Sequence, residues 1–384
     1  MRPHVAHLLL SIHRVLQPSS QLVRDLARQQ GEALVSCYVP LARAGNDVRQ
    51  NGIRLKNCQR ALAAALDAGT LDERTAQVAA RELTLAAAED PRAVRHDGLA
   101  LFAWQDESVV MQSAAPFAPL VTVAPRFYIV PLLQISAPTE PTFVLALSRH
   151  SVRVIDQSSG TELPLSADVP RSVTAVVGAE RRRATLQQHS TGAGSVSHGY
   201  GEGEDDVLPE IELFCRRVAD ALAGNLDSAR AALILAGDVQ ITAMFRRAAT
   251  GWTVLGDAIP GNHDRTPPAD LARLAESIVA ARRDAARGEL KALYGARTAS
   301  NRTSVDLVEI GNAARAGRID VLLLDESVAL DEPRRRAAQE PHTVQPEGPF
   351  NDEAVLTLRF GGDVHLLPAS AMPTPAPQAA IYRF

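Results

Sequence analysis

The sequence predicts an α/β protein of two or three domains, and three observations lead to that prediction. The chain has 384 residues, which is more than one small hydrophobic core usually organises. Segments with the 3.6-residue period of a helix alternate with short apolar segments typical of strands. A breaker rich in Pro, Ser and Thr at residues 136–142 separates two such series.

Charge and hydropathy restrict the class of protein. The net charge of −4 gives no overall attraction to nucleic acid, so an RNA contact has to come from local patches. No apolar run reaches the roughly 18 residues that a membrane helix needs. The 3 cysteines are scattered, which favours neither a disulfide framework nor a zinc site. We therefore expect a cytoplasmic protein without membrane association.

The first third mixes predicted strands and helices. Residues 33–40 are typical of a strand that ends at Pro40. Residues 53–66 and 72–88 are rich in Ala and Leu with helical periodicity, so we expect two helices there. Three more strands are expected in the segments GLALFAW, ESVVMQS and RFYIVPLLQI. The breaker at 136–142 is the first expected domain boundary.

The middle third opens with a predicted hairpin, in which FVLALS and SVRVIDQ are the strands. A Gly-rich and His-containing loop follows at 189–206, and it ends in an acidic cluster that suits the start of a helix. That helix is expected in VLPEIELFCRRVADALAG. Residues 231–237 then have the composition of a buried strand, and VQITAMFRRA that of a short helix.

The last third begins in a long amphipathic helix at 270–295, which we expect to be interrupted or bent near Gly288. A helix at 304–317 and a strand at 318–325 should follow. The segments EAVLTLRF, GGDVHLLP and QAAIYRF are interpreted as strands. This alternation predicts a compact α/β domain with three layers.

The segment GDAIPGNHDR at 256–265 contains a tetrapeptide that metallophosphoesterases use to bind metals. A second Gly-Asp pair ends at Asp238, but Ile241 occupies the position where the next carboxylate ligand would stand. The other ligand segments of such enzymes are absent. Since Asn and Asp also favour turns and helix caps, we expect a loop that leads into the following helix, and no metal.

The order of these segments resembles a known family. AALILAGDVQITAMF, DLARLAESIV, ELKALYGA and DLVEIGNAARAGRIDVLLLDE are similar to class-I translation termination factors of archaea and eukaryotes, which include Pelota-like proteins. They resemble more closely the bacterial branch of this archaeo-eukaryotic release factor family. VSCYVPLARAGNDVRQNGIRLKNCQRAL is similar to the N-terminal segment of the same bacterial family.

The resemblance implies three domains. Residues 1–136 would form an N-terminal α/β domain comparable to the codon-recognition domain of termination factors. Residues 137–287 would form an RNase H-like middle domain that carries the loop 189–206. Residues 288–384 would form a C-terminal α/β/α domain like the ribosomal protein L7Ae.

The resemblance also implies an RNA contact in the N-terminal domain. Termination factors read the stop codon with an Asn-Ile-Lys-Ser loop, and NGIRLKN stands at the comparable place. Lys56 is the nearest counterpart of the family's lysine, although the tetrapeptide itself is absent. The RNA-binding candidates are Arg49, Asn51, Arg54, Lys56 and Asn57. A solvated basic helix face is the alternative interpretation.

A second loop of the family carries Gly-Gly-Gln and promotes ester hydrolysis in the peptidyl-transferase centre. The loop 189–206 stands at the comparable place, just before its own helix, but has neither adjacent glycines nor glutamine. His198 is the candidate general base near neutral pH. The glycines that would form the tip of the loop are Gly192, Gly194, Gly199, Gly201 and Gly203. A plain surface insertion is the alternative.

Three functions stay open at this point. The resemblance implies a ribosome-associated factor that binds the A site in rescue, quality control or dormancy, in contact with rRNA, tRNA and mRNA. Its partners would be the ribosome and a translational GTPase, and no cofactor is implied. The alternatives are a peptidyl-tRNA ester hydrolase that uses the loop of His198, or a protein that binds another RNA or protein away from the ribosome.

Overall fold

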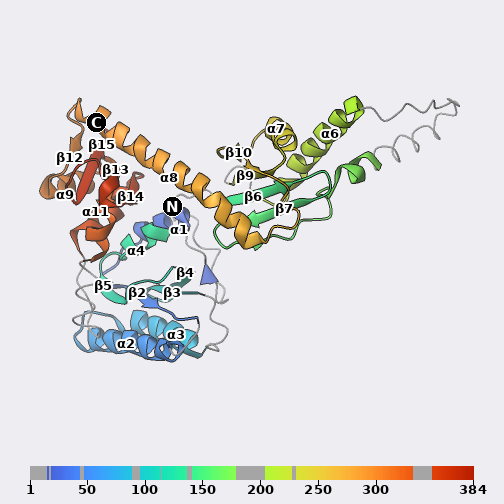
Figure 1. The fold of residues 1–384 in the computed structure, drawn as a ribbon. Helices are drawn as coiled ribbons and strands as arrows, with labels where there is room; N and C mark the ends of the chain where they lie inside the picture. The colour runs from blue at the N-terminus through green and yellow to red at the C-terminus, as the bar shows by residue number, and fades with distance from the viewer. Residues whose placement is uncertain are drawn as a thin grey trace, which may run out of the picture. The chain divides into compact units, whose positions relative to one another are not determined.

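The computed structural model describes residues 15–16, 19–43, 47–88, 96–113, 115–135, 141–178, 204–226, 231–331 and 348–384. The chain forms two compact units (Figure 1). The first unit joins Met1–Pro138 to Arg287–Phe384, and the second is Thr139–Ala286. The first and last of the predicted domains thus share one unit, and the division into three domains stays a prediction.

The N-terminal part of the first unit contains a five-stranded sheet in the order β1-β4-β3-β2-β5. Neighbouring strands are antiparallel, except that β1 and β4 are parallel. The strands are β1 (Val15–Leu16), β2 (Leu34–Pro40), β3 (Gly98–Trp104), β4 (Glu107–Ser113) and β5 (Leu120–Ala124). The predicted strands at 33–40, GLALFAW and ESVVMQS are confirmed.

Both faces of this sheet are covered, because successive side chains of a strand point to opposite faces. Cys37 and Val39 of β2 pack with helices α2 (Val48–Asp67) and α3 (Glu73–Ala88), which confirm the two predicted helices. Tyr38 points to the other face, where it packs with helices α1 (Ser20–Arg28) and α4 (Val130–Ile135).

The C-terminal part of the first unit has three layers. Its sheet has the order β12-β15-β13-β14, in which β13 and β14 are parallel. The strands are β12 (Thr303–Ser304), β13 (Ile319–Asp325), β14 (Asp363–Leu367) and β15 (Gln378–Tyr382). Leu322 and Leu324 pack against α9 (Leu307–Arg315) and α11 (Pro349–Arg359), whereas Leu323 packs against Tyr294 of α8 (Pro268–Thr298). The predicted α/β class is confirmed.

One continuous core joins the two parts of the first unit. It contains Tyr38 and Phe127 from the first segment together with Leu322 and Tyr382 from the last. Asn351 of α11, only 1% exposed, is inserted between them. Its Oδ1 accepts a hydrogen bond from the backbone N–H of Ile129 at 2.8 Å, and its Nδ2 donates to the carbonyl of Phe127 at 3.1 Å.

The second unit has a six-stranded sheet in the order β10-β9-β6-β7-β8, with β11 also paired to β9. The strands are β6 (Thr142–Leu147), β7 (Val152–Asp156), β8 (Thr161–Glu162), β9 (Ala232–Gly237), β10 (Thr253–Val254) and β11 (Ile259–Pro260). Helices α6 (Glu204–Leu222) and α7 (Val239–Ala248) pack on one face. The first turns of α8 pack on the other face through Leu271 and Ala275. The predicted hairpin, the buried strand and both helices are confirmed.

Three predictions of local structure are wrong. Residues 126–135 are not a strand, because α4 begins at Val130 with Pro131 in its first turn, where proline is favoured. Residues 353–359 belong to helix α11, with Phe360 as its C-cap, and the helix is so largely buried that no periodicity shows in the sequence. Helix α8 runs unbroken through Gly288, since one glycine costs a helix only about 1 kcal/mol relative to alanine.

No helix among the described residues has both the length and the apolar composition to cross a membrane.

Candidate nucleic-acid interface

Asn51 and Arg54 hold the loop between β2 and α2. The side-chain amide of Asn51 donates to the carbonyl of Ala42 and accepts from its N–H, each at 2.9 Å. Arg54 donates to the carbonyl of Pro40 at 3.3 Å and to Oδ1 of Asn51 at 3.2 Å. These two candidates therefore fix the start of α2, and their polar groups are already engaged inside the protein.

The other candidates lie farther along α2. Arg49 and Lys56 are exposed, and Asn57 is half-buried and accepts a hydrogen bond from Arg60 at 3.3 Å. Figure 1 shows α2 next to α3, both covering one face of the sheet. Of the five candidate residues, the structure thus leaves Arg49 and Lys56 turned to solvent; their role in RNA binding stays a prediction.

Two residues outside the five candidates also lie on the exposed side of α2. Ile53 is 51% exposed, and Arg60 is exposed as well. With Arg49 and Lys56 they follow one another at intervals of four, three and four residues, which places them along one side of a helix. We call Arg49, Ile53, Lys56 and Arg60 the basic face of α2. The spacing was present in the sequence and would have indicated both additional residues.

The charge along this helix has one sign over most of its length. Residues 48–66 contain four basic residues and no Asp or Glu; the first carboxylate is Asp67 at the end of α2. Arg49 and Lys56 lie seven residues apart, or about 10 Å along the axis. A row of cations along one side of a helix can contact phosphates of a nucleic-acid backbone, which gives binding that weakens with salt.

The candidate residues of the loop 189–206 lie outside the described residues. They are Gly192, Gly194, His198, Gly199, Gly201 and Gly203. Helix α6 begins just after them, at Glu204. Their roles stay predictions.

The segment around Gly-Asn-His-Asp is a loop closed by its own contacts. Nε2 of His263 donates to the carbonyl of Pro260 at 3.2 Å, and Nδ1 lies 3.3 Å from Oγ1 of Thr266. Arg153 donates to the carbonyls of His263 and Thr266 at 2.8 and 2.9 Å and pairs with Glu162 at 2.6 Å. Both ring nitrogens of the histidine are therefore engaged within the loop.

The second half of the apparent metal motif caps a helix. Oδ1 of Asp238 accepts from the N–H of Gln240 at 2.8 Å at the start of α7. Within the ranges that the structure describes, no three His, Cys, Asp or Glu side chains come close enough to hold a metal ion. The Gly-Asp and Gly-Asn-His-Asp segments thus have structural roles as cap and loop.

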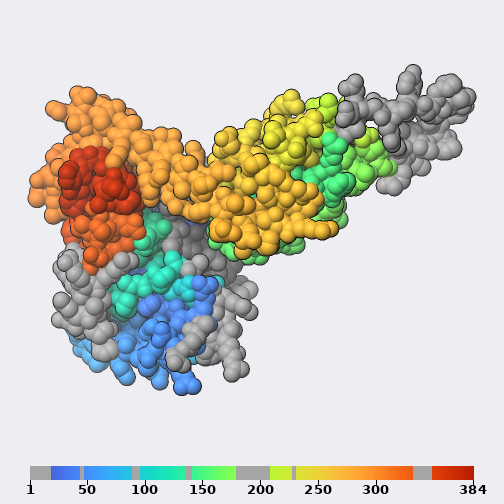
Figure 2. All heavy atoms as spheres, viewed as in Figure 1, coloured from blue at the N-terminus to red at the C-terminus, as the bar shows by residue number. Residues whose placement is uncertain are grey.

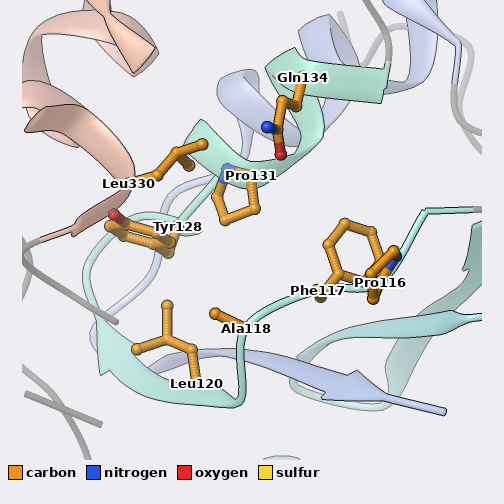
Figure 3. Close-up of a pocket in the computed structure, with 8 residues that line it drawn as sticks. All are labelled: Pro116, Phe117, Ala118, Leu120, Tyr128, Pro131, Gln134 and Leu330. Carbon is orange, nitrogen blue, oxygen red and sulfur yellow. The ribbon is translucent and has the colours of Figure 1, made fainter. Parts of the chain in front are cut away.

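The pocket drawn in Figure 3 belongs to the first unit. Residues 116–134 supply most of its lining, and Leu330 from the last part of the chain lies beside Tyr128 and Pro131 (Figure 3). Gln134 at its edge donates to the carboxylate of Glu326. The lining contains no carboxylate, histidine or thiol. It therefore offers none of the usual acid, base or nucleophile groups.

One buried carboxyl has an altered acidity. Glu353 of α11 is 4% exposed, and its Oε2 has no hydrogen-bond partner in the part of the chain that the structure describes. Burial raises the pKa of Glu353 to about 7; Asp352 adds to this rise, while Gln378 and Arg315 oppose it. The group lies inside the C-terminal layers, so it bears on stability rather than on the basic face of α2.

Comparison with known proteins shows a match to one protein family. Residues 141–318 match the family model described as Bacterial archaeo-eukaryotic release factor family 3. The predicted family resemblance is confirmed. The match includes the hairpin β6–β7, the buried strand β9 and helices α7 to α9.

Several solved structures are similar over nearly the whole chain. Archaeal translation termination factor aRF1 has 16% identity, with 95% of this chain and 97% of that chain covered and a TM-score of 0.22. Archaeoglobus fulgidus Pelota has 12% identity, coverage of 96% and 94%, and a TM-score of 0.33. S. cerevisiae Dom34, a translation termination-like factor involved in RNA quality control pathways, has 9% identity, coverage of 96% and 92%, and a TM-score of 0.39. No curated protein sequence matches the chain.

Proposed function

We propose that this protein is a ribosome-associated factor related to class-I release factors, which binds the ribosomal A site in rescue, quality control or dormancy. The observation that carries the proposal is the match of residues 141–318 to a bacterial archaeo-eukaryotic release factor family. The basic face of α2 supports it, because it offers cations for rRNA, tRNA or mRNA despite the net charge of −4. On this proposal the protein acts in the cytoplasm, with a translational GTPase as a further partner.

Binding without hydrolysis is the form of this function that the sequence supports best. The family's tripeptide Gly-Gly-Gln is absent from residues 189–206, where no two glycines are adjacent. Two adjacent glycines allow backbone conformations that other residues resist. A factor that lacks them can still occupy the A site and exclude other ligands from it.

The test is cosedimentation of the purified protein with 70S ribosomes, empty and stalled, at two salt concentrations. We expect the protein to migrate with the ribosomes and to be released progressively as salt rises, because counterions compete for the phosphates. The proposal is overturned if the protein stays at the top of the gradient with both kinds of ribosome at both salt concentrations. The scaffold would then serve another RNA or protein partner.

The second candidate function is hydrolysis of the ester bond of peptidyl-tRNA. It is favoured by a single observation, that His198 lies in a Gly-rich segment just before α6. An imidazole with an ordinary pKa can act as a general base near neutral pH. The wild type should then release peptide from stalled complexes and His198→Ala should not. Equal release by both proteins, or none by the wild type, excludes this candidate.

A further inference from the structure

One end of the C-terminal sheet brings together basic and aromatic side chains from three places in the sequence. Arg318 lies in the turn between α9 and β13, and Arg383 follows β15. Arg359 is the last residue of α11, and Phe360 is its C-cap. We call these four residues the C-terminal patch. Atoms of the last part of the chain, coloured red, lie at the surface in Figure 2.

One backbone hydrogen bond and two short distances show that these residues are neighbours. The N–H of Arg383 donates to the carbonyl of Arg318 at 3.0 Å. Gly317 has a φ of +66°, and a Cβ on it would lie 3.2 Å from the Phe360 ring. A Cβ on Gly361 would lie 3.9 Å from Nη2 of Arg383. The turn at Gly317, the end of α11 and the end of β15 therefore meet in one patch.

Two of the guanidinium groups lie over aromatic rings. Cζ of Arg318 is 5.3 Å from the centroid of the buried Tyr382 ring, and Cζ of Arg359 is 5.9 Å from that of Phe360. Both distances lie within the range of cation–π attraction, which orients the charged group. Arg318 is exposed and Arg359 is half-buried, so both side chains still reach solvent.

The patch keeps a positive charge after its internal pairs are counted. Arg383 pairs with Asp320 at 3.8 Å, and the adjacent Arg24 pairs with Asp363 at 2.5 Å. Arg318 and Arg359 have no ion pair with any residue in the described ranges. Phe360 is 43% exposed, and Phe384, which follows Arg383, is 70% exposed.

We propose that the C-terminal patch binds single-stranded RNA. Arginine cations contact phosphates, while exposed rings and guanidinium planes provide surfaces on which unpaired bases stack. Duplex RNA hides its base faces, so the exposed Phe360 ring favours an unpaired segment. An acidic peptide would pair with the arginines through its carboxylates, whereas unpaired RNA offers both phosphates for the arginines and flat base faces for the ring. The inference does not rest on the proposed ribosome function, since the patch can bind free RNA by itself.

The test measures the binding of the full-length protein to a fluorescein-labelled, unstructured single-stranded RNA of twelve nucleotides by fluorescence anisotropy. A hairpin RNA of the same composition is the competitor. We expect the double variant Arg318→Gln with Arg359→Gln to bind at least tenfold more weakly than the wild type. The slope of log K against log salt concentration should become less steep by about 1 to 2. Phe360→Leu keeps an apolar side chain against Gly317, and this variant should bind at least about fivefold more weakly than the wild type.

Two control variants distinguish binding by the C-terminal patch from a general effect of positive charge. Arg282→Gln with Arg283→Gln removes two exposed arginines of α8 and should change affinity by less than about twofold. Arg318→Lys with Arg359→Lys keeps the charge but loses the planar groups, so it should keep the salt slope and lose affinity. The inference is wrong if the patch variants bind like the wild type, if the α8 control loses as much, or if the wild type prefers the hairpin. If the wild type binds the single-stranded RNA but does not bind ribosomes, the proposed function is contradicted and the inference on the C-terminal patch stands.

Discussion

Asn51 uses both ends of its side-chain amide on the backbone of Ala42. Replacing it by alanine leaves that N–H and carbonyl without partners in a half-buried loop, which typically costs about 1–3 kcal/mol. We expect Asn51→Ala to lower the free energy of unfolding by this amount in urea denaturation. Asn57→Ala is the matched control, because Asn57 only accepts from Arg60 and should cost less than about 0.5 kcal/mol. Equal losses in the two variants would refute the loop-closing role.

Glu353 makes stability depend on pH. Its pKa is raised to about 7 in the folded protein from a reference value of 4.5. Between these two values the folded state holds a proton that the unfolded state has lost, so stability is full below about pH 4.5 and falls as the pH rises towards 7. The carboxylate is then buried with a charge and without a full set of partners.

Glu353→Gln removes this titration. The variant should match the wild type in unfolding free energy near pH 4.5 and exceed it at pH 8, because the neutral amide carries no desolvation cost. Urea unfolding of both proteins across this range measures the difference. A difference that does not change with pH would show that Glu353 does not titrate as described.

At the level of single elements, glycines in different surroundings should respond in opposite directions. Gly52 lies inside α2 and a Cβ on it would meet no atom within 4 Å, so Gly52→Ala should stabilise the protein by about 0.5–1 kcal/mol. A Cβ on Gly237 would lie 2.4 Å from the carbonyl oxygen of Leu147, where β9 and β6 pair. Gly237→Ala should therefore destabilise by about 1–3 kcal/mol. Thermal unfolding checks both, and a shift of the same sign would contradict this packing.

The elements that the sequence predicts well are those with a clear period or a clear end. The strand at β2 stops at Pro40, and α2 shows regular apolar positions. Helices α4 and α11 are mistaken for strands because their apolar residues are buried on most sides, as Ala354, Val355 and Leu358 are in α11. In such a helix, composition outweighs periodicity.

The candidate site was likewise predictable from the sequence only in part. Sequence position leads to α2 and to Lys56, but it cannot tell which polar side chains are used internally. Only the fold shows that Asn51 and Arg54 bond to the loop backbone. Likewise, the C-terminal patch joins Arg318, Phe360 and Arg383 through tertiary contacts between turns that lie far apart in the sequence.

At the level of the whole molecule, the first unit should unfold as one body although its two segments are 148 residues apart in the sequence (Thr139–Ala286). Asn351→Ala leaves the N–H of Ile129 and the carbonyl of Phe127 without their partner. We expect amide hydrogen exchange to accelerate both in β2 and in β13, since the two share one core. Asn312→Ala on the exposed side of α9 is the control. Acceleration confined to one segment would contradict a shared core.

The sharpest test of ribosome binding is the ribosome affinity of a variant in which the basic face of α2 is neutralised. Arg49→Gln with Lys56→Gln should lower the affinity for 70S ribosomes about tenfold or more. The slope of log K against log salt concentration should correspond to about two fewer released counterions. Arg282→Gln with Arg283→Gln removes the same charge from α8 and should cosediment like the wild type. Wild-type-like binding by the α2 variant would contradict the role of the basic face, and no binding by the wild type would contradict the proposed function.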